Sequence, residues 1–383
     1  MIMFERNLEM MERTCKRCIM STKGDPTITF DENGYCCYCS EALKMKNKVY
    51  HPDKKGERKL QYMIKRIKET SVHSPYDCIM GISGGLDSSY LLYLGSTWGL
   101  RILAVHINDG FDTEISKQNL RKLRKATNCD YVEIIPDSEQ YANINKAYLK
   151  AGVPNIAIPQ DNILFAEIHR MMRKYKIHYF LTGGNFSLES ILQKGNTHDA
   201  YDLVQIKDIF KKYGTGKINK LHFMSTSDRE RDQQFLRYKT LAPLNLVDYR
   251  RDKAFKELHD FCGFEYYGRK HLENVFTAFV QLYWLPKKFN VDKRTSHLSS
   301  MIASGQMTRE EALEEMKEPL YDLKMMNEYI SIIKQKTNIS DEEFDLIMKE
   351  PGRSHDEFKT EMDSFRFKAK RSVWLIVKRF IKK

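Results

Sequence analysis

The chain has 383 residues, and its 42% hydrophobic and 11% aromatic content excludes a disordered chain because it supplies enough apolar side chains for a sizeable core. The formal charge of +12 favours anionic partners, but it does not choose among nucleotides, phosphorylated sugars, nucleic acid and acidic lipids. No apolar run approaches the length of a membrane-spanning helix. The N-terminus lacks the basic segment and following apolar stretch of a secretory signal, so we expect a cytoplasmic protein.

A cysteine-rich segment comes first. Cys15 and Cys18 form one C-x2-C pair, and Cys36 and Cys39 form a second pair. Each pair can present two thiolates to one tetrahedral ion, so the spacing predicts a four-cysteine Zn2+ site. Four thiolates leave no open coordination position, which makes the expected zinc structural. Cys37 falls outside this register, and a metal-free or redox-active segment is the alternative interpretation.

The residues around these cysteines suggest a zinc ribbon. Residues 27–30 read as a strand, and residues 31–34 read as a tight turn built on an Asn-Gly pair. Residues 44–68 follow with Met and Ile at helical spacing among many lysines, and they predict one connecting helix. Pro75 ends this helical segment before the first strand of the next region.

Strands alternate with helices through the middle of the chain, and this alternation predicts a doubly wound α/β fold with a parallel sheet. The later region reads as helical. The predicted strands are residues 78–82, 102–107, 131–135 and the strand that starts at Tyr179, and the predicted helices are residues 88–98, 114–127 and 162–175. We expect three regions, namely a zinc-ribbon module at 1–45, a nucleotide-binding domain at 46–267 and a helical C-terminal region at 268–383.

A glycine-rich turn lies between the first predicted strand and the helix that follows it. The unpaired amides at the start of that helix, together with the helix dipole, favour a phosphate group. Asp87 can orient Mg2+ or cap the helix, and no lysine follows as it would in a Walker loop. An ordinary Gly-Ser turn with a helix cap is the alternative. The turn comprises Ser83, Gly84, Gly85, Leu86, Asp87, Ser88 and Ser89.

This turn resembles the SGGxDS signature of the PP-loop ATP pyrophosphatase superfamily, whose adenine-nucleotide α-hydrolase-like members split ATP into AMP and pyrophosphate. The resemblance implies that the end of the second strand frames adenine and ribose, which points to His106 and Asn108. It also implies that Gly183, in a later glycine turn, lies at the same sheet edge. A purely structural histidine is the alternative for His106.

The chain as a whole resembles the N-acetyl sugar amidotransferase family of bacterial surface-polysaccharide biosynthesis. Two departures are Cys37, where Asn is commoner, and the order Asn108-Asp109-Gly110-Phe111 in place of Asp-Asn-Gly-Trp. The motifs that carry the resemblance, besides the cysteines and the glycine turn, are Asp25-Pro26-x-Ile28-x-Phe30-Asp31, Leu241-Ala242-Pro243-Leu244, Arg269-Lys270-His271-x-Glu273, Trp284 to Arg294, His297-Leu298-Ser299-Ser300 and Gly305 to Ala312.

The family resemblance implies that ATP adenylates the acetamido oxygen of a nucleotide-linked N-acetyl sugar. Ammonia then attacks and gives an acetamidino sugar, in the biosynthesis of lipopolysaccharide, O-antigen or a related glycan. Lys293 and Arg294, together with Mg2+, are candidates to offset phosphate charge, and Lys270, His271 and Glu273 are candidates to bind the sugar nucleotide. A solvated basic face is the alternative for Lys287, Lys288, Lys293 and Arg294.

The sequence shows no glutaminase, because the chain starts Met1-Ile2 and the scattered cysteines lack a recognisable base. The resemblance therefore implies a separate glutaminase of the histidine-biosynthesis type, together with its cyclase-like barrel partner. Nucleic acid is not expected as a partner. Two alternatives stay open, namely a PP-loop tRNA thiolase and a zinc-containing nucleotide-binding scaffold without catalysis. The thiolase needs paired cysteines beyond the loop, and here they are single.

The last residues form a basic segment with regularly spaced apolar side chains. Val373, Ile376, Val377 and Phe380 would share one face of a helix over residues 365–383. Such a helix could rest on the anionic inner face of a membrane, and docking on the protein or a partner is the alternative.

Overall fold

Five parallel strands form one sheet in the computed structural model, which describes residues 12–364 and residue 367. The order β3-β2-β1-β4-β5 shows that the chain moves outward from β1 to β3 and then returns to the other side of β1. This reversal makes the carboxyl ends of β1 and β4 a topological switch point, where doubly wound folds bind ligands. The predicted doubly wound α/β fold is confirmed. The strands are β1 (Cys78–Gly81), β2 (Ile102–Ile107), β3 (Asp130–Ile134), β4 (Tyr179–Leu181) and β5 (Lys239–Leu241).

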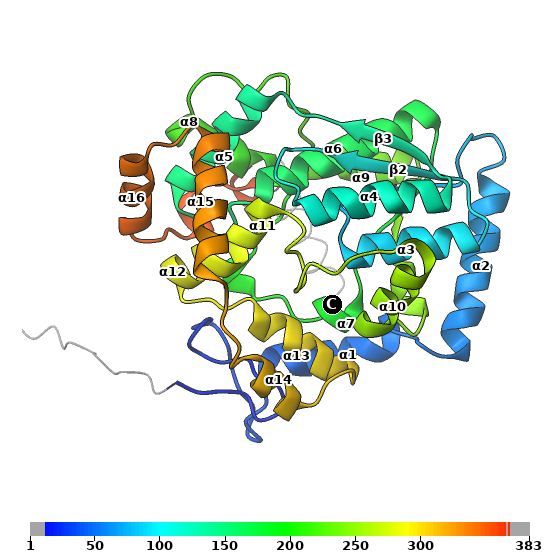
Figure 1. The fold of residues 1–383 in the computed structure, drawn as a ribbon, viewed down its shortest axis with the longest axis horizontal. Coiled ribbons are helices and arrows are strands. Elements are labelled where there is room, and N and C mark those ends of the chain that lie inside the picture. The colour runs from blue at the N-terminus through cyan, green and yellow to red at the C-terminus, as the bar shows by residue number, and fades with distance from the viewer. Residues whose placement is uncertain (1–11, 365–366, 368–383) are drawn as a thin grey trace, which may run out of the picture.

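Helices cover both faces of the sheet because both faces are apolar (Figure 1). Successive strand residues alternate in direction. Met80 and Ala104 therefore join the buried cluster that includes α3 (Leu86–Thr97) and α4 (Glu114–Thr127). Ile79 and Val105 join the cluster on the opposite face, which includes residues of α6 (Ile158–Tyr175).

After β5 the described residues form helices, short turns and loops, as predicted for the C-terminal region. In Figure 1, α15 and α16 lie to the left of the sheet, and α1, α13 and α14 lie below it. The remaining helices are α1 (Cys37–Val49), α2 (Lys54–Thr70), α5 (Ser138–Ala151), α7 (Phe186–Glu189), α8 (Leu203–Tyr213), α9 (Thr226–Phe235), α10 (Arg251–Cys262), α11 (Val275–Phe279), the π-helical η3 (Val280–Trp284), α12 (Leu285–Phe289), α13 (Arg294–Ser304), α14 (Arg309–Glu315), α15 (Leu323–Thr337) and α16 (Asp341–Lys349), and the 3-10 turns are η1 (Lys194–Asn196), η2 (Pro243–Leu246), η4 (His355–Glu357) and η5 (Glu361–Asp363).

Two local predictions were wrong. The single helix expected over residues 44–68 is two helices, because the Asp53 side chain caps α2 by accepting hydrogen bonds from the amides of Lys55 and Gly56. The strand expected over residues 27–30 is reduced to one isolated bridge between Phe30 and Cys36. The tight turn that follows is present, with Gly34 at φ +79° and its amide donating to Asp31.

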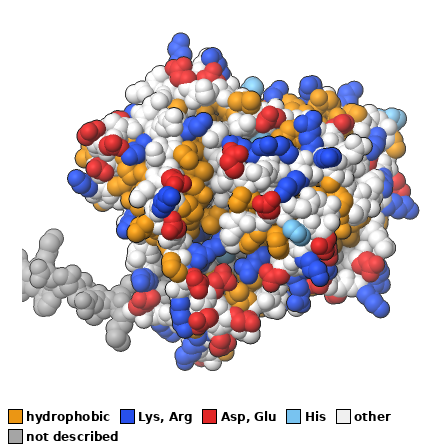
Figure 2. Space-filling view, in the orientation of Figure 1, with side chains coloured by type: hydrophobic (Ala, Val, Ile, Leu, Met, Phe, Trp, Pro, Cys, Tyr) orange, Lys and Arg blue, Asp and Glu red, His pale blue; other side chains and the backbone are white. Residues whose placement is uncertain are grey.

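Among the described residues, no helix combines the length and the apolar character that crossing a bilayer requires. The predicted amphipathic helix over residues 365–383 lies outside the described residues, apart from Phe367. On the face shown in Figure 2, Lys and Arg side chains are interspersed with Asp and Glu instead of forming one basic patch.

Candidate active site

The glycine turn lies at the switch point, between the carboxyl end of β1 and the first turn of α3. Gly84 has φ +76°, and a Cβ there would lie 2.6 Å from the backbone oxygen of Ser116, so this position accepts only glycine. Gly85 is the N-cap of α3 and supplies no capping side chain. The turn therefore has the geometry of a phosphate-binding loop, with the positive end of a helix dipole behind it.

The serines of the loop differ in what they contact. Ser83 Oγ accepts from the amide of Gly85 at 3.2 Å and lies 3.4 Å from Ser88 Oγ. Ser88 Oγ donates to the backbone oxygen of Gly85, and Ser89 is fully buried with no hydrogen bond to its Oγ from a described residue. Ser83 and Ser88 are therefore the two hydroxyls positioned at the loop itself.

The second glycine turn packs directly on the first. A Cβ on Gly183, which follows β4, would lie 3.0 Å from the carbonyl carbon of Asp87 and 3.0 Å from the nitrogen of Ser88. The two loops after β1 and β4 thus meet at the switch point. The structure brings Gly183 together with the phosphate loop.

Asp87 is engaged by two side chains from distant parts of the chain. Tyr249 donates its hydroxyl to Asp87 Oδ1, and Lys270 donates to Asp87 Oδ2. Lys270 Nζ also lies 3.1 Å from Glu189 Oε1. Burial would lower the pKa of Lys270, but the carboxylates of Asp87 and Glu189 outweigh burial and raise this pKa. Lys270 is therefore a fixed cation beside the phosphate loop.

The segment around Lys270 lies across the loop. Tyr267 accepts the amide hydrogen of Leu86 at 2.7 Å, and Glu273 Oε1 accepts from Ser83 Oγ at 3.1 Å. His271 has a left-handed backbone at φ +63°, which is uncommon for a residue with a side chain, and its Nε2 lies 3.6 Å from Glu189 Oε1. The structure places the three residues predicted to bind sugar nucleotide, Lys270, His271 and Glu273, at or beside the phosphate loop.

A pocket rich in cationic groups opens next to Lys270. Lys293 is the N-cap residue of α13, and its backbone oxygen accepts from Ser296 Oγ at 3.0 Å, but its ammonium group forms no hydrogen bond or ion pair with any residue that the structure describes. Burial lowers the pKa of Lys293. Arg294, in contrast, is held by Asp292, with Nη2 at 2.7 Å from Oδ2, so of the two predicted residues only Lys293 is free to meet a ligand. The other polar residues that line the pocket are Arg251, Arg269, Lys270, Gln281, His297 and Glu315.

His297 faces the same pocket beside three cationic or titratable groups. Its ring lies 5.9 Å from the ring of His271, measured between centroids. Burial, with contributions from His271, Lys270 and Lys293, lowers the pKa of His297 well below its usual range. His297 is therefore a neutral imidazole at neutral pH.

A separate pocket adjoins the carboxyl end of β2, where the sequence places His106 and Asn108. Both ring nitrogens of His106 are hydrogen-bonded, Nδ1 with the backbone oxygen of Ile82 at 2.8 Å and Nε2 with Asp112 Oδ2 at 2.9 Å. Asn108 donates to Glu133 at 2.9 Å. His106 thus orients the strand end, and the basic residues of this pocket are Lys117, Arg121 and Arg124.

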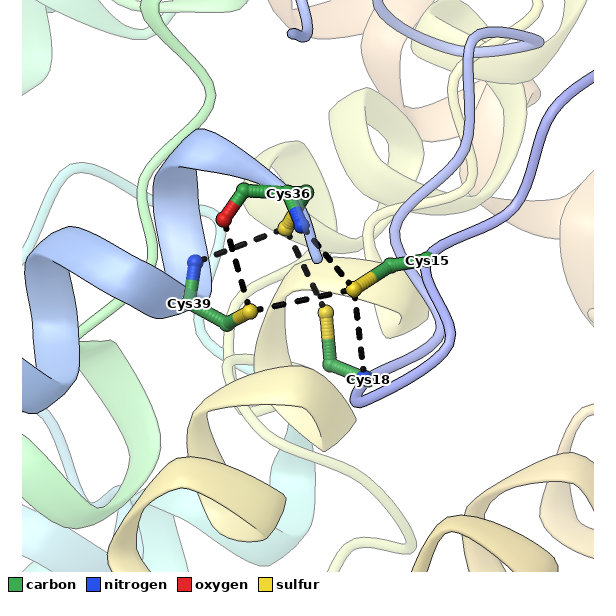
Figure 3. Close-up of side chains that lie close together, drawn as sticks. All are labelled: Cys15, Cys18, Cys36 and Cys39. Atoms are coloured by element: carbon green, nitrogen blue, oxygen red, sulfur yellow. Dashed lines mark hydrogen bonds between the residues drawn. The ribbon is translucent and has the colours of Figure 1, made fainter. Parts of the chain in front are cut away.

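The four predicted cysteine ligands converge at the N-terminal module (Figure 3). All four Sγ atoms lie within 4.8 Å of one another, with Cys15 to Cys39 at 3.7 Å and Cys18 to Cys36 at 3.6 Å. Tetrahedral bonds of about 2.3 Å from zinc would place two sulfurs about 3.8 Å apart. The cluster therefore fits one tetrahedral ion and is consistent with a zinc ribbon, and Cys37 lies outside it.

This module is anchored to the C-terminal region. Arg309 donates to the backbone oxygens of Cys18 at 3.2 Å and Cys15 at 3.4 Å, and Ser299 accepts from the amide of Ile19. All four cysteine ligands are buried. The cluster therefore braces α13 and α14, which follow Lys293 in the chain.

Several residues at the site were not singled out from the sequence. Glu189, Tyr249 and Tyr267 have no recognisable local pattern, because their roles arise from contacts with a loop far away in the chain. Asp161, in the first turn of α6, is near enough to His271 for the two charges to interact: burial raises the pKa of Asp161 to about 6, and His271 opposes that shift.

Residues 273–372 match a family model described as "LPS biosynthesis protein WbpG-like, C-terminal domain". Comparison with curated protein sequences gives no match. Among solved structures, the NMN synthetase from Francisella tularensis is similar to this chain, with 14% sequence identity and a TM-score of 0.31. The similarity covers 75% of this chain and 98% of that chain.

The NH3-dependent NAD synthetase from Campylobacter jejuni subsp. jejuni NCTC 11168, in complex with the nitrate ion, is also 14% identical. It covers 74% of this chain and 93% of that chain, with a TM-score of 0.32. Similarity this low supports no conclusion about fold or function, and the fold assignment rests on the strand order. The similarity to a known family is therefore confined to residues 273–372, which are similar to the C-terminal domain of WbpG-like LPS biosynthesis proteins.

Proposed function

We propose that this protein is the ATP-dependent synthetase subunit of an amidotransferase that converts the acetamido group of a nucleotide-linked N-acetyl sugar to an acetamidino group. The supporting observation is that one site combines a phosphate-type loop with residues of the WbpG-like domain. Glu273 contacts Ser83 of the loop, and Lys293 and His297 line the pocket next to Lys270. The region that matches an LPS biosynthesis family thus contacts a loop of the kind that binds nucleotide phosphates.

An amide carbonyl carbon is a poor electrophile, and the proposed chemistry activates it by transferring AMP to the amide oxygen. The acetamido oxygen attacks the α-phosphorus of ATP, so an oxygen–phosphorus bond forms and pyrophosphate leaves. Ammonia then attacks the imidate carbon, the carbon–oxygen bond breaks, and AMP leaves with the former acetamido oxygen. The products are an acetamidino sugar, AMP and pyrophosphate, with one proton shed from the attacking nitrogen.

The cationic residues suit the first step. Negative charge builds up on the leaving pyrophosphate, and fixed cations in a partly buried site stabilise such charge more strongly than water does. Lys270 is held by two carboxylates, whereas Lys293 has no such partner and is free to contact a phosphate. A Mg2+ ion bound with ATP would neutralise part of the same charge.

We further propose Zn2+ as the ion of the four-cysteine cluster, in a structural role, because the four buried thiolates leave no open position. Ammonia would come from a separate glutaminase of the histidine-biosynthesis type with its barrel partner. The purified chain should then use ammonium salts and not glutamine. A cytoplasmic enzyme at the inner face of the membrane fits a pathway of surface-glycan assembly.

The tRNA thiolase alternative depends on activated cysteines beyond the loop. Burial raises the pKa of Cys78, Cys129 and Cys262, which is the opposite of what a nucleophilic thiol requires. Among the residues that the structure describes, the N-terminal cluster is the sole group of cysteines able to hold a metal. These observations favour amidotransfer over thiolation.

Mass spectrometry tests the proposed function. The chain is incubated with ATP, Mg2+, ammonium and a panel of nucleotide-linked acetamido sugars. One sugar should lose about one dalton, since an oxygen is replaced by an NH group, and AMP should appear with it. Absence of AMP with every sugar of the panel would contradict the proposal.

A further inference from the structure

We infer that Glu273 is a ligand of the divalent cation that accompanies ATP at the phosphate loop, an inference that rests on the proposed function. The sequence alone suggested Asp87 for this cation and sugar binding for Glu273. The contacts of the two carboxylates favour Glu273 over Asp87 as the cation ligand, because the oxygens of Asp87 already have donors and one oxygen of Glu273 has none among the described residues.

Three carboxylates surround the loop, and two of them are satisfied. Asp87 accepts from Tyr249 at Oδ1 and from Lys270 at Oδ2. Glu189 contacts Lys270 and His271 at Oε1 and accepts from the amide of Asn185 at Oε2. Every oxygen of these two carboxylates therefore already has a donor or a cationic partner.

Glu273 differs from both. Glu273 is 7% exposed, and its Oε1 accepts a hydrogen bond from Ser83 Oγ at 3.1 Å. Its Oε2 is buried and has no hydrogen-bond partner among the described residues. An isolated buried carboxylate oxygen is costly, and such groups normally pair with a donor or coordinate a metal. An oxygen of this kind is what Mg2+ prefers as a protein ligand.

The position of this carboxylate points to the same ligand. A Cβ on Gly85 would lie 2.4 Å from Glu273 Oε1, so the carboxylate lies directly against the N-cap of α3. Phosphates of ATP would approach this helix end, and two anions so close repel each other unless a cation lies between them. The geometry thus favours a cation bridging Glu273 and the phosphates.

A consequence follows for nucleotide affinity. Without a divalent cation, Glu273 repels the triphosphate, and with one bound it attracts the complex. The Glu273→Gln chain keeps an oxygen that can accept from Ser83 but loses the negative charge. It should bind the metal complex more weakly, by about 10-fold or more, and bind metal-free nucleotide at least as well as the unaltered chain does.

Titration calorimetry with the α,β-methylene analogue of ATP, with Mg2+ and with chelator, measures these affinities. Electron paramagnetic resonance of Mn2+ then reports the metal held in the ternary complex. The matched control is Glu265→Gln, which removes an exposed carboxylate paired with Lys122 at 2.6 Å, and which should behave as the unaltered chain does. Thermal unfolding verifies that both variants are folded.

The expected result is a metal requirement that is strong in the unaltered chain and Glu265→Gln and largely lost in Glu273→Gln. Equal Mn2+ affinity in folded Glu273→Gln and in the unaltered chain would overturn the inference while leaving the nucleotide site intact. A failure of all three chains to bind the analogue with or without metal would instead overturn the proposed function.

Discussion

The ammonium group of Lys270 contacts the carboxylate of Asp87, although 183 residues separate them in the chain. The contact joins the phosphate loop to the segment that leads into residues 273–372, the region that matches the WbpG-like family model. Because Lys270 also contacts Glu189, it holds together three parts of the site that the sheet alone does not connect.

Replacing Lys270 by Met should remove this connection. Two partly buried carboxylates would lose their cation, so the free energy of unfolding should fall by about 3 kcal/mol. AMP formation should fall by roughly 100-fold or more, because a fixed charge beside the pyrophosphate is lost. Chemical denaturation and a coupled pyrophosphate assay measure the two effects. Lys287→Met, at an exposed lysine, is the matched control, and an unchanged rate in folded Lys270→Met would contradict the assignment.

Lys293 should show a conflict between stability and activity. Burial lowers its pKa, so protonated Lys293 destabilises the folded state at neutral pH, and stability is regained as the pH rises past this lowered pKa toward the unfolded value. Lys293→Met should therefore raise Tm at pH 7, by about 2 °C or more, while AMP formation falls. A lowered Tm together with full activity would show that Lys293 is an ordinary structural residue.

Asp161 should make stability depend on pH. Its pKa is raised to about 6 in the folded chain, above the unfolded value, so its contribution is fully present below about pH 4 and is lost as the pH rises through 6. Asp161→Asn should thus be more stable than the unaltered chain at pH 7, by about 3 kcal/mol, and about equal at pH 4. Urea unfolding at both pH values measures this difference, and a constant difference would refute the shift.

The four-cysteine cluster should bind one zinc ion per chain. Cys36→Ser should lose the metal and destabilise α13 and α14, because Arg309 bonds to the backbone at Cys15 and Cys18. Cys37→Ser changes a neighbouring thiol that is outside the cluster, and it should retain the full metal content. Elemental analysis and Tm measure the outcomes. Equal zinc loss in both variants would mean that the ligand set is different.

Local patterns in the sequence predicted much of this molecule. The glycine turn, the alternating strands and the two C-x2-C pairs are short-range signals, and the structure confirms the sheet and the convergence of the cysteines. The break between α1 and α2 is also local, but the Asp53 cap was overlooked because the lysines and the helical spacing on both sides of it read as one continuous helix. Strand β5 was missed because three residues with two exposed carry almost no periodic signal.

The surroundings of the phosphate loop could not be predicted in this way. Tyr249 and Tyr267, which lie just before and just after α10, reach the loop only in the folded chain, and Glu189 of α7 reaches Lys270 in the same way. Likewise, Lys293 and Arg294 are neighbours with the same charge, and the contacts of Arg294 with Asp292 and with the backbone oxygen of Glu318 distinguish them only in the folded chain.

The origin of the oxygen in AMP tests the central claim most directly. The substrate sugar is prepared with 18O in its acetamido group and is converted with ATP and ammonium, and the AMP is analysed by mass spectrometry. The account predicts AMP about two daltons heavier, because the acetamido oxygen leaves on the α-phosphate. Formation of ADP, or AMP that carries none of the label, would contradict adenylation of the amide oxygen.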